Sequence, residues 1–121
     1  MKILIVDDSN VMRKIIKRAL KDAGFGAHAV VEAGNGLEGL AALRREPFDL
    51  VLCDWNMPQM NGIEMLAALK AEKLPVRFGF VTSETTPAML KQATDAGAEF
   101  LIGKPFTTEI FQRTLQGMLG E

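Results

Sequence analysis

The sequence Ile3-Leu4-Ile5-Val6-Asp7-Asp8 decides the fold of this chain. Four apolar residues, most of them β-branched, are followed at once by two acids. A continuous apolar run of this kind is typical of a strand in a parallel sheet that helices cover on both faces. The stretch therefore predicts a buried parallel strand with carboxylates at its carboxyl end.

The same order of strand and helix repeats along the rest of the chain. Apolar residues recur at helical spacing over 11–23, with Asp8 or Ser9 as the N-terminal cap and Gly24 at the helix end. Four further apolar runs, each followed by a helical segment, predict strands at 29–31, 48–53, 76–81 and 100–102. The chain therefore consists of five successive strand–helix units.

Five such units predict an α/β fold with three layers, α/β/α. The common solution at this size is a doubly wound, flavodoxin-like sheet of five parallel strands in the order 2-1-3-4-5. The chain has 121 residues. Because a domain typically holds roughly 100–200 residues, we expect residues 1–121 to form a single domain.

The composition narrows the class of protein further. There are 14 basic and 15 acidic residues, and the net charge of −1 argues against a general nucleic-acid binder, which carries a clear basic excess. One cysteine excludes an internal disulfide and suits a reducing compartment. No run approaches the roughly 20 apolar residues of a membrane span, and the N-terminus lacks a signal-peptide pattern. We expect a cytoplasmic monomer with neither nucleic-acid nor membrane partners.

Polar side chains follow four of the predicted strands directly. They are Asp7 and Asp8 after the first strand, Asp54 after the third, Thr82 after the fourth and Lys104 after the fifth. The carboxyl ends of parallel strands share one edge, and open sheets bind ligands where the strand order reverses, here between strands one and three. We therefore expect the three aspartates to form one pocket, with the hydroxyl and the ammonium group beside it.

Three carboxylates in one pocket repel one another unless a cation relieves the repulsion. Mg²⁺ is suited to the site, because it takes oxygen ligands and typically uses one or two carboxylates with a substrate phosphate. Lys104 and Thr82 add groups that bind phosphoryl oxygens. The set predicts phosphoryl transfer to a carboxylate nucleophile, Asp54, with Asp7 and Asp8 holding the metal. Each residue alone is an ordinary cap or strand end, so the prediction depends on their common position.

Four short motifs contain these residues: Val6-Asp7-Asp8-Ser9, Asp54-Trp55-Asn56-Met57-Pro58 with Gly62, Val81-Thr82, and Lys104-Pro105-Phe106. The combination of these four motifs is highly specific for one protein family. With them the chain resembles, over essentially its whole length, the receiver domains of two-component response regulators. Within that family it is most similar to the single-domain chemotaxis regulators.

The resemblance implies a role for each matching position. Asp54 is the expected phosphoacceptor, which takes a phosphoryl group from a histidine kinase or a small acyl phosphate. Mg²⁺ is the expected cofactor, bound by Asp8, Asp54 and the backbone carbonyl of Asn56, with Asp7 acting through water. A protein of this kind catalyses only its own phosphorylation and dephosphorylation, so we do not expect an enzyme acting on other substrates.

The resemblance also assigns the residues around the phosphoacceptor. Lys104 is expected to contact the phosphoryl group and to precede Pro105 in a cis peptide bond. Thr82 is expected to move toward the phosphoryl group and shift an equilibrium between inactive and active states. Asn56 and Glu84 match positions that tune hydrolysis. Two polar side chains there can orient a water molecule, which predicts comparatively fast loss of phosphate.

One position departs from the family pattern. An aromatic residue usually lies three positions before the lysine and swings inward on activation, but this chain has Leu101 there. Strand alternation directs the neighbouring Phe100 to the opposite face, so it cannot substitute. The alternative is that activation is coupled to the rest of the domain through Thr82 and the loop after it. Next to the phosphoacceptor, we expect Trp55 to be partly exposed and Cys53 to be a buried strand residue.

From the length of 121 residues we expect no attached output domain, and we expect output to pass through protein contacts. The resemblance implies the flagellar motor switch as target. A phosphorelay intermediate, a receiver that binds partners without phosphate, and an aspartyl-phosphate phosphatase are the alternatives. The phosphatase often needs an acid where this chain has Asn56, which cannot transfer a proton. Basic residues crowd the first helix, as a solvated face or as a docking surface for an acidic partner: Arg13, Lys14, Lys17, Arg18 and Lys21.

Overall fold

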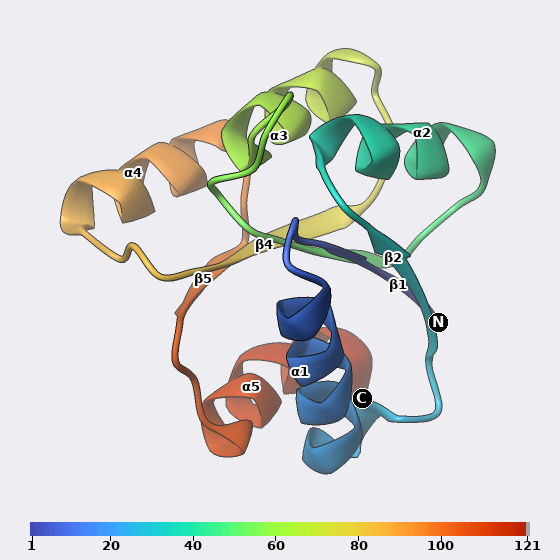
Figure 1. Cartoon of the computed structure of the whole chain (residues 1–121), viewed down its shortest axis with the longest axis vertical. Coiled ribbons are helices and arrows are strands. Elements are labelled where there is room, and N and C mark those ends of the chain that lie inside the picture. Colours follow the sequence, from blue (N-terminus) through green and yellow to red (C-terminus); the bar gives the residue numbers. More distant parts are fainter. Residues whose placement is uncertain (121) are drawn as a thin grey trace.

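The computed structural model describes residues 1–120, so the last residue of the predicted domain, Glu121, lies outside it. Five parallel strands form one sheet in the order β2-β1-β3-β4-β5 (Figure 1). Both the α/β class and the strand order are confirmed, and each predicted strand end lies within two residues of the observed one. The strands are β1 (Lys2–Val6), β2 (Ala29–Ala33), β3 (Leu50–Cys53), β4 (Arg77–Thr82) and β5 (Phe100–Gly103).

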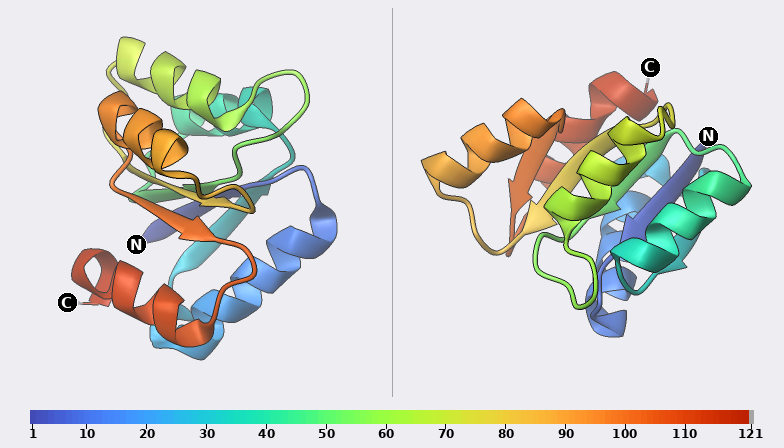
Figure 2. Two further views of the ribbon diagram at one scale, coloured as in Figure 1. Left: turned by 90° about the vertical axis from the view of Figure 1, so that its left-hand side faces the viewer. Right: turned by 90° about the horizontal axis from the view of Figure 1, so that it is seen from above.

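Helices cover both faces of the sheet. Figures 1 and 2 show α2, α3 and α4 on one face and α1 and α5 on the other. Within residues 1–120, none of these helices has the length and apolar character that crossing a membrane requires. The helices are α1 (Asn10–Leu20), α2 (Gly36–Arg45), α3 (Gly62–Ala71), α4 (Pro87–Ala96) and α5 (Thr108–Leu115).

The end signals of the first helix have clear physical causes. Ser9, rather than Asp8, is the cap, since its hydroxyl accepts from the amide of Met12 at 3.1 Å. The chain continues past α1 through one wider turn, Lys21–Phe25, that unwinds where Gly24 takes a left-handed φ of 99°. Only glycine adopts that conformation without strain, so the predicted helix end is confirmed.

The core consists of two apolar layers, one on each side of the sheet. Alternation along β1 directs Leu4 and Val6 toward α2 and α3, and Ile3 and Ile5 toward α1 and α5. All four side chains are fully buried. A strand buried on both faces is the arrangement that the continuous apolar run predicted. It places the residues that follow β1 at the edge of the sheet, beyond the core.

The two neighbouring residues Phe100 and Leu101 do lie on opposite faces of β5. Leu101 packs with the α3 and α4 layer, and Phe100 with the α1 and α5 layer. The ring of Phe100 lies over Gly79, its partner in β4; a Cβ atom there would be 2.0 Å from the ring. Phe100 is therefore held on the face away from the position of the usual aromatic residue.

Candidate acidic metal and phosphoryl site

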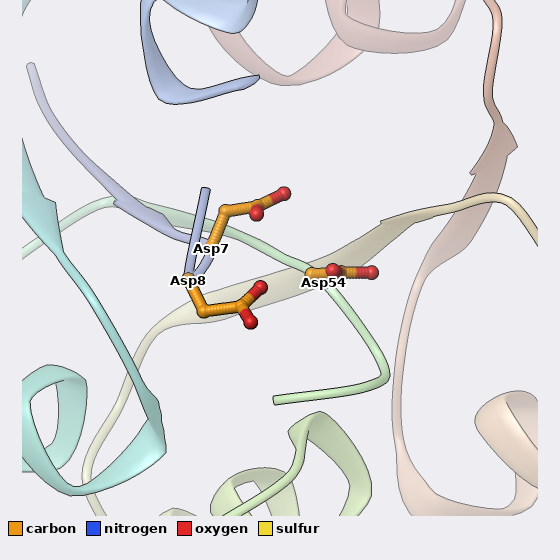
Figure 3. A group of neighbouring side chains, drawn as sticks. All are labelled: Asp7, Asp8 and Asp54. Atoms are coloured by element: carbon orange, nitrogen blue, oxygen red, sulfur yellow. The ribbon is translucent and has the colours of Figure 1, made fainter. Parts of the chain in front are cut away.

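Asp7, Asp8 and Asp54 come together at the carboxyl edge of the sheet. Each offers a carboxylate oxygen within 4.8 Å of the others, and Figure 3 shows the three side chains facing a common space. The cause is the pairing of β1 with β3, in which Val6 lies opposite Cys53 and its carbonyl accepts from the Asp54 amide at 2.8 Å. Strand pairing thus brings together acids that are 46 residues apart (54 − 8) in the sequence.

Lys104 is the basic residue of this pocket. Its Nζ lies 3.0 Å from Asp7 Oδ2 and 3.5 Å from Asp54 Oδ2. The Lys104–Pro105 peptide bond is cis. One ammonium group against three carboxylates leaves an excess of negative charge, which a divalent cation would offset. The donor set, carboxylate and carbonyl oxygens at a water-accessible edge, fits Mg²⁺.

The three carboxylates differ in how fully they are already bonded. Asp7 is 1% exposed, and both its oxygens have partners: Oδ1 accepts from the Ser9 amide at 2.9 Å and Oδ2 from Lys104. Asp54 Oδ1 accepts from the Trp55 amide at 2.7 Å. Among residues 1–120, no hydrogen bond involves the exposed carboxylate of Asp8. Asp8 is therefore the acid most available to a cation, followed by Asp54, whose Oδ2 has only the longer 3.5 Å contact with Lys104.

The surroundings of Asp54 act on its ionisation in opposite directions. Burial raises the pKa of Asp54, and although the nearby Lys104 lowers it, the charge of Asp7 adds to the increase. The net result is a pKa above the ordinary value of 3.8. Without a cation nearby, the ionised form of Asp54 is therefore energetically unfavourable in the folded protein. The adjacent Cys53 is fully buried, as predicted, and burial raises the pKa of its thiol, which keeps the thiol unreactive.

The loop after β4 meets the loop after β3 beside the pocket. Thr82 is fully buried at the end of β4, and its hydroxyl accepts from the Glu84 amide at 3.4 Å. The Asn56 side-chain amide donates to Glu84 Oε1 at 3.1 Å. The Lys104 amide also donates to the carbonyl of Thr82, at 2.8 Å. The two residues expected to tune hydrolysis are therefore in direct contact, and a backbone bond ties Thr82 to Lys104.

The expectation of a partly exposed Trp55 is wrong. The residue is only 8% exposed, and its ring lies 4.7 Å from that of Phe80, centroid to centroid. The loop turns inward because the amide of Gly62 donates to the Trp55 carbonyl at 2.9 Å. This contact closes the loop between β3 and α3 over the core. The burial of Trp55 depends on tertiary contacts, which the pattern of a strand end does not contain.

The basic residues of α1 are largely paired with acids. Arg13 and Lys17 both contact Glu32 of β2, at 2.9 and 3.4 Å, and Arg18 contacts Asp22 at 3.0 Å. Arg13 also donates to the backbone carbonyl of Asp7 at 2.6 Å, a contact that the sequence pattern did not predict. On a helix face rich in basic residues, nothing in the sequence distinguishes this arginine from its neighbours.

Residues 3–116 match the model of the family described as response regulator receiver domain. The chain belongs to this family. It is 41% identical over 119 residues to the chemotaxis protein CheY-3 of Vibrio cholerae, covering 95% of this chain and 88% of that one. It is also 41% identical over 120 residues to chemotaxis protein CheY of Pseudomonas aeruginosa, with 96% and 94% covered. The chain is thus a receiver domain homologous to the CheY chemotaxis regulators.

Solved structures agree with this placement. The chemotaxis protein CheY4 of Vibrio cholerae superposes with a TM-score of 0.85 at 34% identity, covering 98% of both chains. A CheY-like receiver domain from Methanospirillum hungatei gives a TM-score of 0.84 at 29% identity, covering 98% of this chain and 92% of that one. Receiver domains are signalling proteins rather than classical enzymes. The resemblance stated from the sequence motifs is therefore confirmed.

Proposed function

We propose that residues 1–121 act as one phosphorylation-activated switch, in which Asp54 accepts a phosphoryl group from the phosphohistidine of a kinase. The observation that carries this proposal is the cluster of Asp54 with two further aspartates and Lys104 at one edge of the sheet. Membership of the receiver family supports it. No second acid lies two residues after Asp54, where Asn56 stands, and this weighs against a phosphatase of small substrates.

In the proposed reaction, an Asp54 oxygen forms a bond to phosphorus while the phosphorus–nitrogen bond of phosphohistidine breaks. The electron pair of that bond stays on the imidazole nitrogen, which leaves with the kinase. The Lys104 ammonium lies 3.5 Å from Asp54 and would bind the oxygens of the transferred phosphoryl group. Mg²⁺, held by Asp8, Asp54 and the Asn56 carbonyl, would supply positive charge toward the phosphoryl oxygens.

The proposed readout uses the hydroxyl of Thr82, which would turn toward the phosphoryl group and draw the loop after β4 with it. A cleft beside this loop extends from Thr85 and Lys104 to the partly exposed apolar side chains of Leu90, Leu101 and Ile110. Movement at the site can therefore change a surface that α4, β5 and α5 share. Without an aromatic residue at 101, we propose that coupling runs through Thr82 and this loop.

We propose a histidine kinase as the phosphoryl donor and a protein of the flagellar motor switch as the target, with the chain acting as a monomer in the cytoplasm. The names of the relatives from Vibrio cholerae and Pseudomonas aeruginosa, both chemotaxis proteins, support this choice. A phosphorelay intermediate would instead pass its phosphoryl group to a second histidine protein. The two roles are distinguished by identifying the proteins that the phosphorylated form binds: a motor-switch protein in the first case and a histidine phosphotransfer protein in the second.

The proposal is tested by incubating the protein with Mg²⁺ and an acyl phosphate and following intact mass and Trp55 emission. We expect Mg²⁺-dependent quenching and a transient phosphoryl adduct in the wild-type protein. Asp54→Asn should show no adduct, whereas Asp95→Asn, which changes an exposed acid of α4, should form it normally. No adduct in the wild-type protein would contradict the proposal, and multiple turnover of unrelated phosphate esters would favour a phosphatase.

A second expected result concerns the lifetime of the phosphorylated form. Glu84→Leu removes the carboxylate that holds the Asn56 side chain and, with it, one of two groups that can orient a water molecule. We expect the adduct to decay several-fold more slowly, as measured by intact mass after removal of the phosphodonor. The matched control is Glu99→Leu, which changes an acid paired with Arg77 before β5. Equal decay of Glu84→Leu and the wild-type protein would contradict the role of Glu84.

A further inference from the structure

The side chain of Arg13 joins three separate parts of the chain. Its Nη1 donates to the backbone carbonyl of Asp7 at 2.6 Å, its Nε to Glu32 Oε1 at 2.9 Å and its Nη2 to Asn10 Oδ1 at 3.2 Å. The side chain is only 17% exposed although it carries a full charge. One planar guanidinium thus links the segment after β1, the edge strand β2 and the first turn of α1.

The Asp7 carbonyl that Arg13 bonds lies between two of the acids of the pocket. It belongs to the peptide group between Asp7 and Asp8, in the short segment between the end of β1 at Val6 and the start of α1 at Asn10. The sheet fixes this segment on one side, where the Asp7 amide donates to the Ala33 carbonyl at 3.1 Å. Together with the φ angle of Asp8, the orientation of the Asp7–Asp8 peptide plane determines the direction in which the Asp8 side chain leaves the backbone.

Asp8 depends on this backbone more than its neighbours do. Asp7 is held by hydrogen bonds to both carboxylate oxygens, and Asp54 by one hydrogen bond and by its ion pair with Lys104. Among residues 1–120, no hydrogen bond restrains the carboxylate of Asp8. Its position toward the other acids therefore depends on the backbone that carries it, which includes the peptide group that Arg13 holds. A ligand that is free to turn would lose conformational entropy on binding a cation, which lowers affinity.

Arg13 is in turn held by Glu32. β2 pairs with β1 so that Glu32 lies opposite Ile5, which brings its carboxylate to α1. Burial alone would raise the pKa of Glu32, but its hydrogen bonds to Arg13 and Lys17 and their charges bring it below the ordinary value. Glu32 therefore stays ionised at neutral pH and continues to orient the guanidinium.

We propose that Arg13 is a positioning residue of the acidic pocket, which fixes the backbone that carries Asp8 for cation binding by bonding the Asp7 carbonyl, and that Glu32 holds Arg13 in this position. The inference deepens the proposed function, because it assumes that the pocket binds Mg²⁺. Its effect is one of geometry rather than charge. A positive charge near the pocket would by itself weaken cation binding, so the two effects have opposite signs.

The test measures Mg²⁺ affinity by calorimetry and by Trp55 emission in the wild-type protein and in Arg13→Lys. Lysine keeps the charge, but its three donors all lie on one nitrogen, so it cannot reproduce contacts that arginine makes from Nε, Nη1 and Nη2. We expect Mg²⁺ to bind about tenfold more weakly, as is typical when a group that orients a metal ligand is lost. Arg18→Lys is the matched control on the same helix, because Arg18 is 74% exposed and contacts Asp22 instead.

Two further measurements separate positioning from a general loss of structure. Glu32→Gln keeps the arginine at position 13 but weakens the contact that holds its guanidinium. It should therefore lower Mg²⁺ affinity, by less than Arg13→Lys does. The amide resonance of Asp8 in the metal-free protein should move in Arg13→Lys and stay in place in Arg18→Lys. Thermal unfolding of each variant shows whether the fold is retained.

The outcomes that overturn the inference are distinct from those that overturn the proposed function. Wild-type affinity in Arg13→Lys would show that Arg13 does not position Asp8. Tighter Mg²⁺ binding by Arg13→Gln would show that its charge alone matters. If Arg13→Lys fails to fold, unchanged Mg²⁺ affinity in Glu32→Gln is sufficient to overturn the inference. Absence of Mg²⁺ binding by the wild-type protein would instead contradict the proposed function itself.

Discussion

Asp54→Asn is expected to stabilise the metal-free protein against unfolding at neutral pH, although it abolishes the proposed phosphorylation. Burial and the charge of Asp7 raise the pKa of Asp54, so its charged form is less favourable in the folded protein than in the unfolded chain. An amide of the same shape removes that cost. We expect a gain on the order of 1 kcal/mol, or several degrees in the unfolding temperature.

The pH dependence of this gain follows from the direction of the pKa shift. The folded-state pKa of Asp54 lies above its unfolded value, so the destabilising charge is fully present only above the folded-state pKa. As the pH falls through that value, Asp54 takes up a proton in the folded state and the cost disappears. The difference in unfolding temperature between the variant and the wild-type protein should therefore shrink as the pH falls from neutrality toward the ordinary carboxyl pKa of 3.8.

Thermal unfolding in the presence of a chelator measures both effects. Asp95→Asn, on an acid that is 65% exposed and paired with Lys91, should leave the unfolding temperature nearly unchanged. Adding Mg²⁺ should stabilise the wild-type protein more than Asp54→Asn and so narrow the difference between them. A variant less stable than the wild-type protein at neutral pH would mean that the contact between Asp54 and Lys104 outweighs the repulsion.

Much of the fold and the pocket could be predicted because both depend on local pattern. The run from Ile3 to Val6 is buried on both faces, and that burial is visible as unbroken apolar sequence. Once strand order 2-1-3-4-5 is inferred, the rule that ligands bind at the carboxyl edge places Asp7, Asp8 and Asp54 together. No detailed side-chain packing is needed for either step.

The remaining features depend on contacts between loops and helices that sequence patterns do not contain. Trp55 is buried because the Gly62 amide holds its carbonyl and Phe80 receives its ring. Arg13 bonds the Asp7 carbonyl while its Nε donates to Glu32, which the pairing of β2 with β1 places on the α1 side of the sheet. In each case a residue with an ordinary local pattern takes its role from a partner that is distant in the sequence.

Gly62 is the second position at which a large effect is expected. It was part of the motif that suggested the family, but the sequence gives no physical reason for it. In the structure, a Cβ atom at Gly62 would lie 2.4 Å from the carbonyl oxygen of Asp54 and 2.6 Å from the ring of Phe80. The first contact is with backbone, which cannot turn aside as the end of a flexible side chain can. The reason for glycine is therefore the lack of space beside Asp54, the proposed phosphoacceptor.

Gly62→Ala should destabilise the protein by about 3 kcal/mol, or roughly 10 °C in the unfolding temperature, because the methyl group forces apart α3 and the end of β3. The same movement displaces Asp54, so the variant should also form the phosphoryl adduct more slowly at temperatures where it remains folded. Gly117→Ala is the control, since a Cβ there meets nothing within 4 Å and alanine favours a helix. If Gly62→Ala has the same unfolding temperature and the same rate of adduct formation as the wild-type protein, α3 must be able to move away from β3 without cost. Full adduct formation together with a large loss of stability would separate the two effects and show that the pocket keeps its geometry while α3 shifts.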